Sequence, residues 1–151
     1  NKNRSEYKGT DIMLKAAQEI AETYPEEMEL CIAESVPFAE YIEMMNGSDA
    51  ILDQLYSYTP SMNPLEAMAR GIICIGGGEP ENYEILHEEH LRPIINVLPN
   101  YESVYQQLEH FIENPQLIPE LKRQGIEYIS HHHDYVKVAK EYEAFYQKIL
   151  A

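Results

Sequence analysis

Basic residues are scarce in this chain of 151 residues, which has 11 lysines and arginines against 26 aspartates and glutamates. The formal net charge of −15 argues against nucleic acid or an anionic membrane as the main partner, because phosphate binding needs a basic face. An anionic ligand can still bind where a few basic groups and helix N-termini converge. No apolar run approaches the roughly 18 residues of a transmembrane helix, and no segment has a signal-peptide pattern. We expect a cytoplasmic protein, whose full-length form is either free or peripheral at a membrane.

Cysteine and tryptophan are also rare, since the chain has two cysteines, Cys31 and Cys74, and no tryptophan. Each cysteine lies inside a short apolar run, which predicts buried free thiols in a reducing compartment rather than a disulfide framework. No CxxC pair is present, so we expect no metal cofactor. The histidines at 131–133 are interpreted as a solvated bend between helices, because so short a tract binds metal only adventitiously.

The remaining composition is that of one soluble globular domain, with 44% apolar and 25% charged residues. Helical and strand-like apolar periods alternate along it. The expected helices span residues 10–24, 37–47, 79–90, 101–114, 115–132 and 133–151, and the expected strands span residues 28–34, 49–55, 71–78 and 92–99. This alternation predicts an α/β fold with a doubly wound, Rossmann-like, mostly parallel sheet and flanking helices. We expect a first strand to precede residue 1, which would make the chain a piece of a longer protein.

The last expected helix carries a single apolar stripe. It is formed by Tyr135, Val138, Tyr142, Phe145 and Ile149, which recur at alternating spacings of three and four. Packing against the core is the simplest explanation of such a stripe, so we expect these side chains to be buried.

Ligands of parallel sheets bind at the carboxyl ends of the strands. The loops concerned precede Thr10, follow Leu55 and follow Ile75, and these loops also have the most unusual sequences. The first of them, NRSEYKG, places Arg4 and Lys8 beside a helix start. Two cations at a helix start suit a diphosphate, although a solvated surface loop can have the same composition.

The second loop leads into MNPLEAMARG, residues 62–71. Asn63 is expected to cap a helix, with Glu66 reaching back to the Asn63 backbone N–H as in a capping box, and Gly71 is expected to close the helix in a left-handed conformation. This explanation accounts for Glu66 without a ligand. Asp53, at the end of the preceding strand, would orient the loop or a substrate hydroxyl, or cap a turn. A receiver domain that is phosphorylated on Asp53 is a less favoured interpretation, because the acidic pair and lysine of receivers are not seen.

The third loop, IGGGEPE, contains the consecutive glycines 76–78. Glycines after a strand let the backbone approach a ligand and turn its N–H groups toward it, and a following helix adds a further anion site. The alternative is a tight turn that needs positive φ angles. The loop is not the dinucleotide fingerprint, which needs a glycine where Glu81 stands, and no Lys-Ser/Thr pair of a P-loop follows it.

Taken together and in order, the three loops resemble the C-terminal, donor-binding domain of the retaining glycosyltransferases of family four, which have the two-domain GT-B fold. In that family a basic loop with a Lys-Gly pair opens the first helix, as Arg4 and Lys8-Gly9 do here. A segment ending in LEAMAxG follows, here residues 65–71, and then GGxPE, here residues 77–81. The resemblance covers nearly the whole chain. It implies a nucleotide-diphosphate sugar as donor, no metal, and an N-terminal acceptor-binding domain in the full-length chain.

The resemblance also implies a role for each position. Arg4 and Lys8 would be the catalytic residues, neutralising the diphosphate and the charge that grows on it as the glycosidic bond breaks. Glu66 would accept hydrogen bonds from the donor ribose. The complete expected donor-binding set is Tyr58, Ser61, Asn63, Glu66, Gly77, Gly78, Glu79 and Glu81.

One position departs from the family pattern. The first glutamate of the E-x7-E motif, which contacts the transferred sugar in the family, should be residue 58, and Tyr58 stands there. A non-catalytic sugar-nucleotide-binding or assembly subunit is therefore the main alternative to a glycosyltransferase of polysaccharide biosynthesis. In either case we expect this chain alone to bind donor weakly and to turn over little or none of it.

Overall fold

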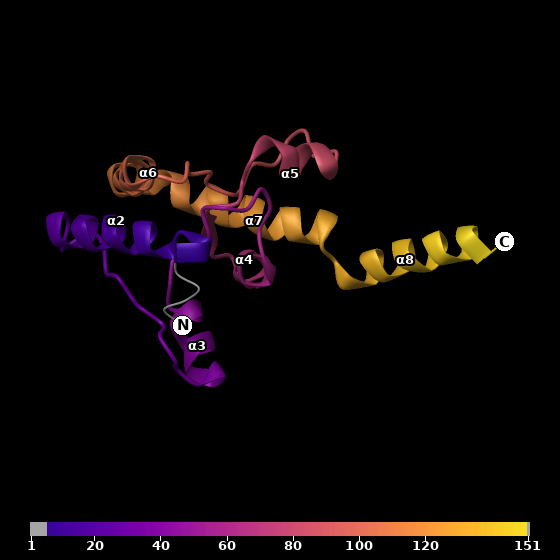
Figure 1. The fold of residues 1–151 in the computed structure, drawn as a ribbon, viewed down its shortest axis with the longest axis horizontal. Coiled ribbons are helices and arrows are strands. Elements are labelled where there is room, and N and C mark those ends of the chain that lie inside the picture. Colours follow the sequence, from indigo (N-terminus) through magenta and orange to yellow (C-terminus); the bar gives the residue numbers. More distant parts are fainter. Residues whose placement is uncertain (1–5, 151) are drawn as a thin grey trace.

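The computed structural model describes residues 6–150 (Figure 1). Its helices and strands are α2 (Thr10–Thr23), α3 (Phe38–Asn46), β1 (Ala50–Leu52), α4 (Met62–Ala69), β2 (Ile73–Ile75), α5 (Pro80–Ile85), α6 (Tyr101–Glu113), the short 3-10 helix η1 (Pro115–Leu117), α7 (Ile118–His132) and α8 (Tyr135–Leu150). Every helix expected from the sequence is present, with shorter bounds in several cases.

The sheet is small and parallel. β1 and β2 pair in the register Ala50↔Ile73 to Leu52↔Ile75, and α4 forms the crossover between them. Ile95 extends the sheet beyond β2 by one parallel bridge, since its N–H donates to Cys74 O at 2.9 Å and its carbonyl accepts from Gly76 N at 2.8 Å. The βαβ unit confirms the α/β class and the parallel pairing. A full doubly wound sheet stays a prediction.

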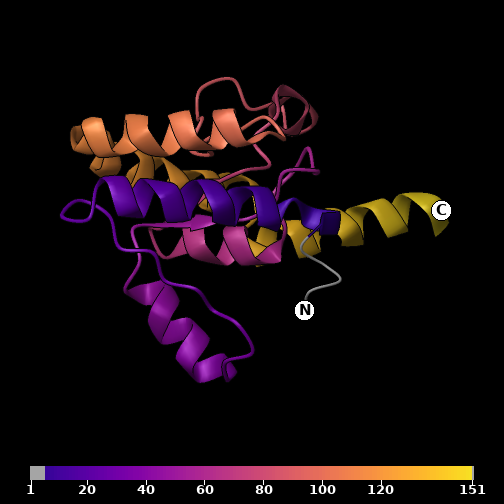
Figure 2. The ribbon, with the colours of Figure 1, turned by 60° about the vertical axis from the view of Figure 1, so that its left-hand side comes forward.

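Helices cover both faces of this sheet. Successive side chains of β2 point to opposite sides, so neighbouring residues of this strand pack into different clusters. Ile75 packs into the cluster between α2 and α6, with Met13, Ala16, Ala17, Ile20, Leu55, Val97, Val104 and Leu108. Cys74 packs into the cluster of α4, α5 and α7, with Met68, Tyr83, Leu91, Ile94 and Tyr128. Figure 2 shows α2 and α6 running side by side over one face. The prediction of a buried free thiol is confirmed for Cys74.

The predicted strand over residues 28–34 is wrong. This segment has no regular structure and forms part of the long connection from α2 to α3 (Figure 1). Met28 and Leu30 pack against the core cluster. A strand also needs a neighbouring strand for its hydrogen bonds, and this segment has none, because β1 pairs only with β2 among the described strands. Cys31 is consequently exposed, which corrects the prediction that both thiols are buried.

The prediction that the stripe of α8 is core is also wrong. The period correctly indicates a helix, but none of the residues of α8 is buried, and α8 extends away from the other helices (Figure 1). α7 ends at His132, and His133 is its C-cap residue. The Asp134 carboxylate then accepts from the N–H groups of Val136 and Lys137, both at 3.0 Å. This cap starts α8 in a new direction, off the sheet.

Candidate functional site

The segment before α2, the loop after β1 and the loop after β2 lie together at the carboxyl ends of the strands. Of the first segment the structure describes Glu6 to Gly9, and Glu6 to Lys8 are helical, so the predicted loop is wrong for these residues. The N–H of Leu55 donates to the carbonyl of Lys8 at 2.9 Å, which joins the first loop to the second. The glycine loop lies against the second loop as well, at Gln54 and Thr59. The sequence prediction that these segments lie at the ligand-binding edge of the sheet is confirmed for the described residues, although the first of them is helical there.

Two glycines of the third loop are required by the backbone itself. Gly76 has φ +108, and a Cβ there would lie 2.6 Å from the carbonyl oxygen of Gln54. Gly77 has φ +71, and a Cβ there would lie 3.1 Å from the carbonyl oxygen of Thr59. The tight-turn explanation therefore accounts for both residues, because the loops after β1 and β2 can pack this closely only without side chains.

A buried carboxylate shapes the loop after β1. Asp53 is 8% exposed, and its two oxygens accept from Ser61 Oγ at 3.0 Å and Ser61 N at 3.3 Å. Ser61 is the residue that immediately precedes α4. The Asp53 carboxylate thus ties the end of β1 to the start of α4, which agrees with the expectation that Asp53 orients this loop.

The predicted capping box is wrong. Since Ser61 is the N-cap, α4 starts at Met62, Asn63 lies exposed within its first turn, and Glu66 is five residues beyond the cap rather than three. The Glu66 carboxylate instead accepts from Arg70 Nη2 at 2.7 Å. Gly71 does follow the helix in the left-handed conformation, with φ +76, as predicted.

Tyr41 of α3 is a neighbour of this region that the sequence did not indicate. Burial raises the pKa of its hydroxyl, and the charges of Glu66 and Asp53 add to the effect. A tyrosine on an amphipathic helix carries no signal for such a position, because the contact depends on how α3 packs against α4 and β1.

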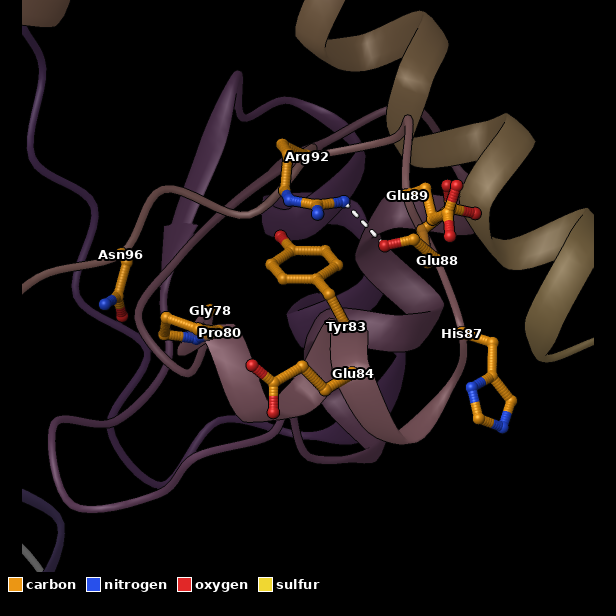
Figure 3. A pocket seen from close by; sticks show the side chains of 9 residues that line it. All are labelled: Gly78, Pro80, Tyr83, Glu84, His87, Glu88, Glu89, Arg92 and Asn96. Carbon is orange, nitrogen blue, oxygen red and sulfur yellow. Dashed lines mark hydrogen bonds between the residues drawn. The ribbon is translucent and has the colours of Figure 1, made fainter.

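An open cavity of about 770 Å³ lies on the other side of the glycine loop (Figure 3). Its lining comes from the glycine loop, from α5 and the turn that follows it, and from the segment that continues the sheet at Ile95; it includes Gly78, Pro80, Tyr83, Glu84, Arg92 and Asn96. Because Ile95 pairs with Ile75 at the end of β2, the cavity lies next to the carboxyl ends of the strands.

One wall of the cavity is a stacked pair. The Arg92 guanidinium lies 4.3 Å from the centre of the Tyr83 ring, and its Nη1 donates to the carbonyls of Glu88 and Leu91 at 2.9 and 2.8 Å. Tyr83 is 4% exposed, and burial raises the pKa of its hydroxyl, which accepts from Ile94 N. These contacts fix both side chains in the cavity wall (Figure 3).

Glu88 anchors the turn that carries Arg92. One of its oxygens lies 2.6 Å from His132 Nε2 on α7, and the other accepts from the N–H groups of His90 and Leu91 at 2.7 and 2.9 Å. The His132 and Glu88 side chains are only 16% and 8% exposed. The hydrogen bond from His132 and those from the backbone lower the Glu88 pKa to about 2.

Residues 7–144 match the family model described as "Glycosyl transferase-like". The chain belongs to this glycosyl transferase-like family. Neither curated proteins nor solved structures gave a match. Across the described part of this glycosyl transferase-like chain, no helix combines the length and apolar character needed to cross a membrane. Residues 6–150 also contain no group of three His, Cys, Asp or Glu side chains placed to hold a metal ion.

The expected site residues of this glycosyl transferase-like domain are only partly gathered. Lys8, Ser61, Gly77 and Gly78 lie in or beside the three segments that meet. Tyr58 lies in the loop after β1 as well, but its side chain is 67% exposed. The remaining expected residues are less closely grouped or not described: Asn63 is exposed, Glu66 faces Arg70, Glu79 precedes α5, Glu81 is exposed in its first turn, and Arg4 lies outside the described residues.

Proposed function

We propose that this chain is the nucleotide-sugar-binding, C-terminal domain of a retaining GT-B glycosyltransferase of the family-four type. The observation that carries the proposal is the meeting of the Lys8 loop, the loop after β1 and the glycine loop in a glycosyl transferase-like chain. Parallel sheets bind ligands at this edge. The rest of the full-length chain would supply the acceptor-binding N-terminal domain and the remaining strands of a doubly wound sheet, in the cytoplasm.

Lys8 and Arg4 would hold the donor diphosphate. Lys8 is half-buried at the point where its own carbonyl is fixed by Leu55, so its side chain starts from a rigid backbone. As the bond from the anomeric carbon to the phosphate oxygen breaks, negative charge collects on the leaving diphosphate. A fixed cation stabilises that charge more than it stabilises the bound donor, which accelerates the step without a metal ion.

Glu66 would bind the donor ribose while keeping its ion pair with Arg70. Its Oε1 is paired with Arg70 Nη2, and Arg70 Nη1 donates to Asn46 Oδ1 at 3.0 Å, so the carboxylate is held from one side. Its second oxygen can then accept from a ribose hydroxyl. The side chain is 41% exposed, which leaves room for that approach.

Calorimetry with UDP-, GDP- and ADP-sugars on the full-length protein tests the proposal. One donor should bind, and Glu66→Ala should weaken it about tenfold or more, as expected when a hydrogen bond to a charged group is lost. Glu102→Ala, an exposed glutamate in the first turn of α6, is the matched control and should leave the affinity unchanged. If no nucleotide binds, the proposal is wrong.

Tyr58 favours a second candidate, a non-catalytic sugar-nucleotide-binding subunit. An exposed tyrosine stands where the family has the glutamate that contacts the transferred sugar. In this case the full-length protein would bind donor but neither hydrolyse nor transfer it. Tyr58→Glu separates the candidates: transfer by the wild-type protein identifies the enzyme, whereas no transfer even after Tyr58→Glu identifies the binding subunit.

A further inference from the structure

α8 has an apolar seam that the rest of the described chain does not bury. Tyr142, Phe145 and Ile149 are 59%, 57% and 64% exposed, and Val138 continues the same line toward the start of the helix. Their alternating spacings of four and three place these residues at the a and d positions of a heptad repeat. A seam of this kind is typical of a helix that pairs with another helix.

The seam alone does not identify the partner, so the charges beside it decide. α8 has three lysines and two glutamates, whereas the whole chain has a net charge of −15. A strongly acidic or strongly basic partner therefore gains little from α8. Two copies of α8 can approach one another without the repulsion that the rest of the chain would cause.

An antiparallel pairing of two copies closes the seam. With Tyr142 opposite Phe145 of the second copy, the heptad spacing brings Val138 opposite Ile149 of the second copy. Two-fold symmetry then repeats both contacts, because the same face is used by each copy. All four side chains of the seam are covered in this register.

The positions that flank the seam fit the same register. Glu141 lies opposite Lys148 of the second copy on one side, and the small Ala139 lies opposite the large Tyr146 on the other. A shift by one heptad would instead place Glu141 opposite its own copy, as it would Ala139. Opposite charges and complementary sizes therefore select one register.

We propose that α8 is a dimerisation element, which pairs with α8 of a second copy of this chain in an antiparallel, two-fold symmetric arrangement. Figure 1 shows that α8 extends away from the other helices, so this pairing puts the two acidic bodies at opposite ends of the helix pair. A helix of 16 residues holds little more than two heptads, so the dimer should be weak and form at high protein concentration. The proposal is independent of the proposed function, because α8 contains none of the expected site residues.

Sedimentation equilibrium of the full-length protein over a concentration series tests the proposal. The wild-type protein should form dimers reversibly. Glu141→Lys and Lys148→Glu each turn two attractive contacts into repulsive ones, so each should weaken the dimer about tenfold. An equimolar mixture of the two variants should regain the wild-type affinity, because opposite charges then face one another again. Glu143→Lys, the same charge change outside the seam, is the matched control and should leave the dimer unchanged.

A second variant tests the apolar seam. Phe145→Ala should weaken the dimer about tenfold or more, as expected when a central aromatic side chain is removed from an interface. Because Phe145 is exposed in the single chain, unfolding of the dissociated protein at low concentration should not change. An unchanged dimer in Phe145→Ala would overturn the proposal.

Three further results would also overturn it. The first is a full-length protein that stays monomeric up to about 1 mM, which means that another segment covers the seam or that nothing does. The second is a mixture of the charge variants that associates no more tightly than either variant alone. The third is a monomer that binds vesicles of phosphatidylcholine and phosphatidylglycerol through α8, which assigns the seam to a membrane surface. Dimers that bind no nucleotide sugar would overturn the proposed function alone, whereas monomers that bind one would overturn this inference alone.

Discussion

The Asp53 carboxylate accepts two hydrogen bonds from Ser61, eight residues later, and so fixes where α4 begins. Because Asp53 follows β1 and Ser61 precedes α4, this one side chain holds both ends of the loop that carries Tyr58. The loop after β1 has its shape before any ligand arrives. A binding site that depends on it is therefore preorganised by a residue that need not touch the ligand.

Removing the carboxylate should destabilise the domain. Asp53→Ala leaves the hydroxyl and N–H of Ser61 without their acceptor, and we expect a loss of roughly 1–3 kcal/mol in the free energy of unfolding. Urea denaturation followed by circular dichroism measures it. Asp11→Ala, at an exposed position in the first turn of α2, is the control, with an expected change within about 0.5 kcal/mol. Equal effects of the two changes would contradict the buried role of Asp53.

Gly76→Ala should be strongly destabilising, by about 2–3 kcal/mol. An alanine there combines an unfavourable φ of +108 with a Cβ 2.6 Å from the backbone oxygen of Gln54. Gly47→Ala is the matched control, because Gly47 has φ −85 and its nearest neighbours to a Cβ lie at 3.6 Å. That change should be neutral or stabilising by up to about 1 kcal/mol. Thermal unfolding of both variants settles the comparison, and a tolerated Gly76→Ala would mean that the two loops are not in contact.

The exposed stripe of α8 should tolerate truncation. Phe145 is 57% exposed, so Phe145→Ala should change the free energy of unfolding of this chain by less than about 0.5 kcal/mol. Ile20 on α2 is fully buried, and Ile20→Ala should cost about 2–5 kcal/mol. Chemical denaturation of the two variants compares them directly. A loss for Phe145→Ala as large as that for Ile20→Ala would place α8 in the core after all.

Acid should weaken the anchor between Glu88 and His132. The folded-state pKa of Glu88, about 2, lies below the ordinary value of 4.5, so its contribution is present above about pH 4.5 and is lost as the pH falls toward 2. That contribution is on the order of 2–3 kcal/mol. Stability measured between pH 6 and pH 3 should fall less steeply in Glu88→Gln than in the wild-type protein. The exposed neighbour Glu89 supplies the control, since Glu89→Gln should leave the slope unchanged.

Local signals in the sequence predicted the helices and the glycine loop well. Gly71 adopts the left-handed conformation after α4, and Gly76 and Gly77 have the positive φ angles that a tight turn needs. Such features depend on residues within about one turn of each other, so a single sequence contains them. The meeting of the three loops also followed, because parallel strands direct their carboxyl ends to the same edge.

Contacts between distant elements were not predictable. Residues 28–34 have a strand composition, but pairing depends on a neighbour that the segment itself does not encode. The stripe of α8 identifies a face without indicating what covers it. Asn63 is a good cap residue locally, yet Asp53 selects Ser61 through a hydrogen bond from the end of a strand. The charges of Asp53 and Glu66 raise the pKa of Tyr41 only because α3 packs against α4 and β1.

The most direct test of the central claim is titration of the full-length protein with a nucleotide-diphosphate sugar, comparing Lys8→Ala with Lys148→Ala. Lys8 lies beside the loop after β1, where its carbonyl accepts from Leu55 N, whereas Lys148 is on the exposed α8, so the two changes remove the same charge at different places. The account predicts donor binding weakened about tenfold or more in Lys8→Ala, and a reduced dependence on salt, with Lys148→Ala unchanged. Equal affinities of the two variants for the donor would contradict it.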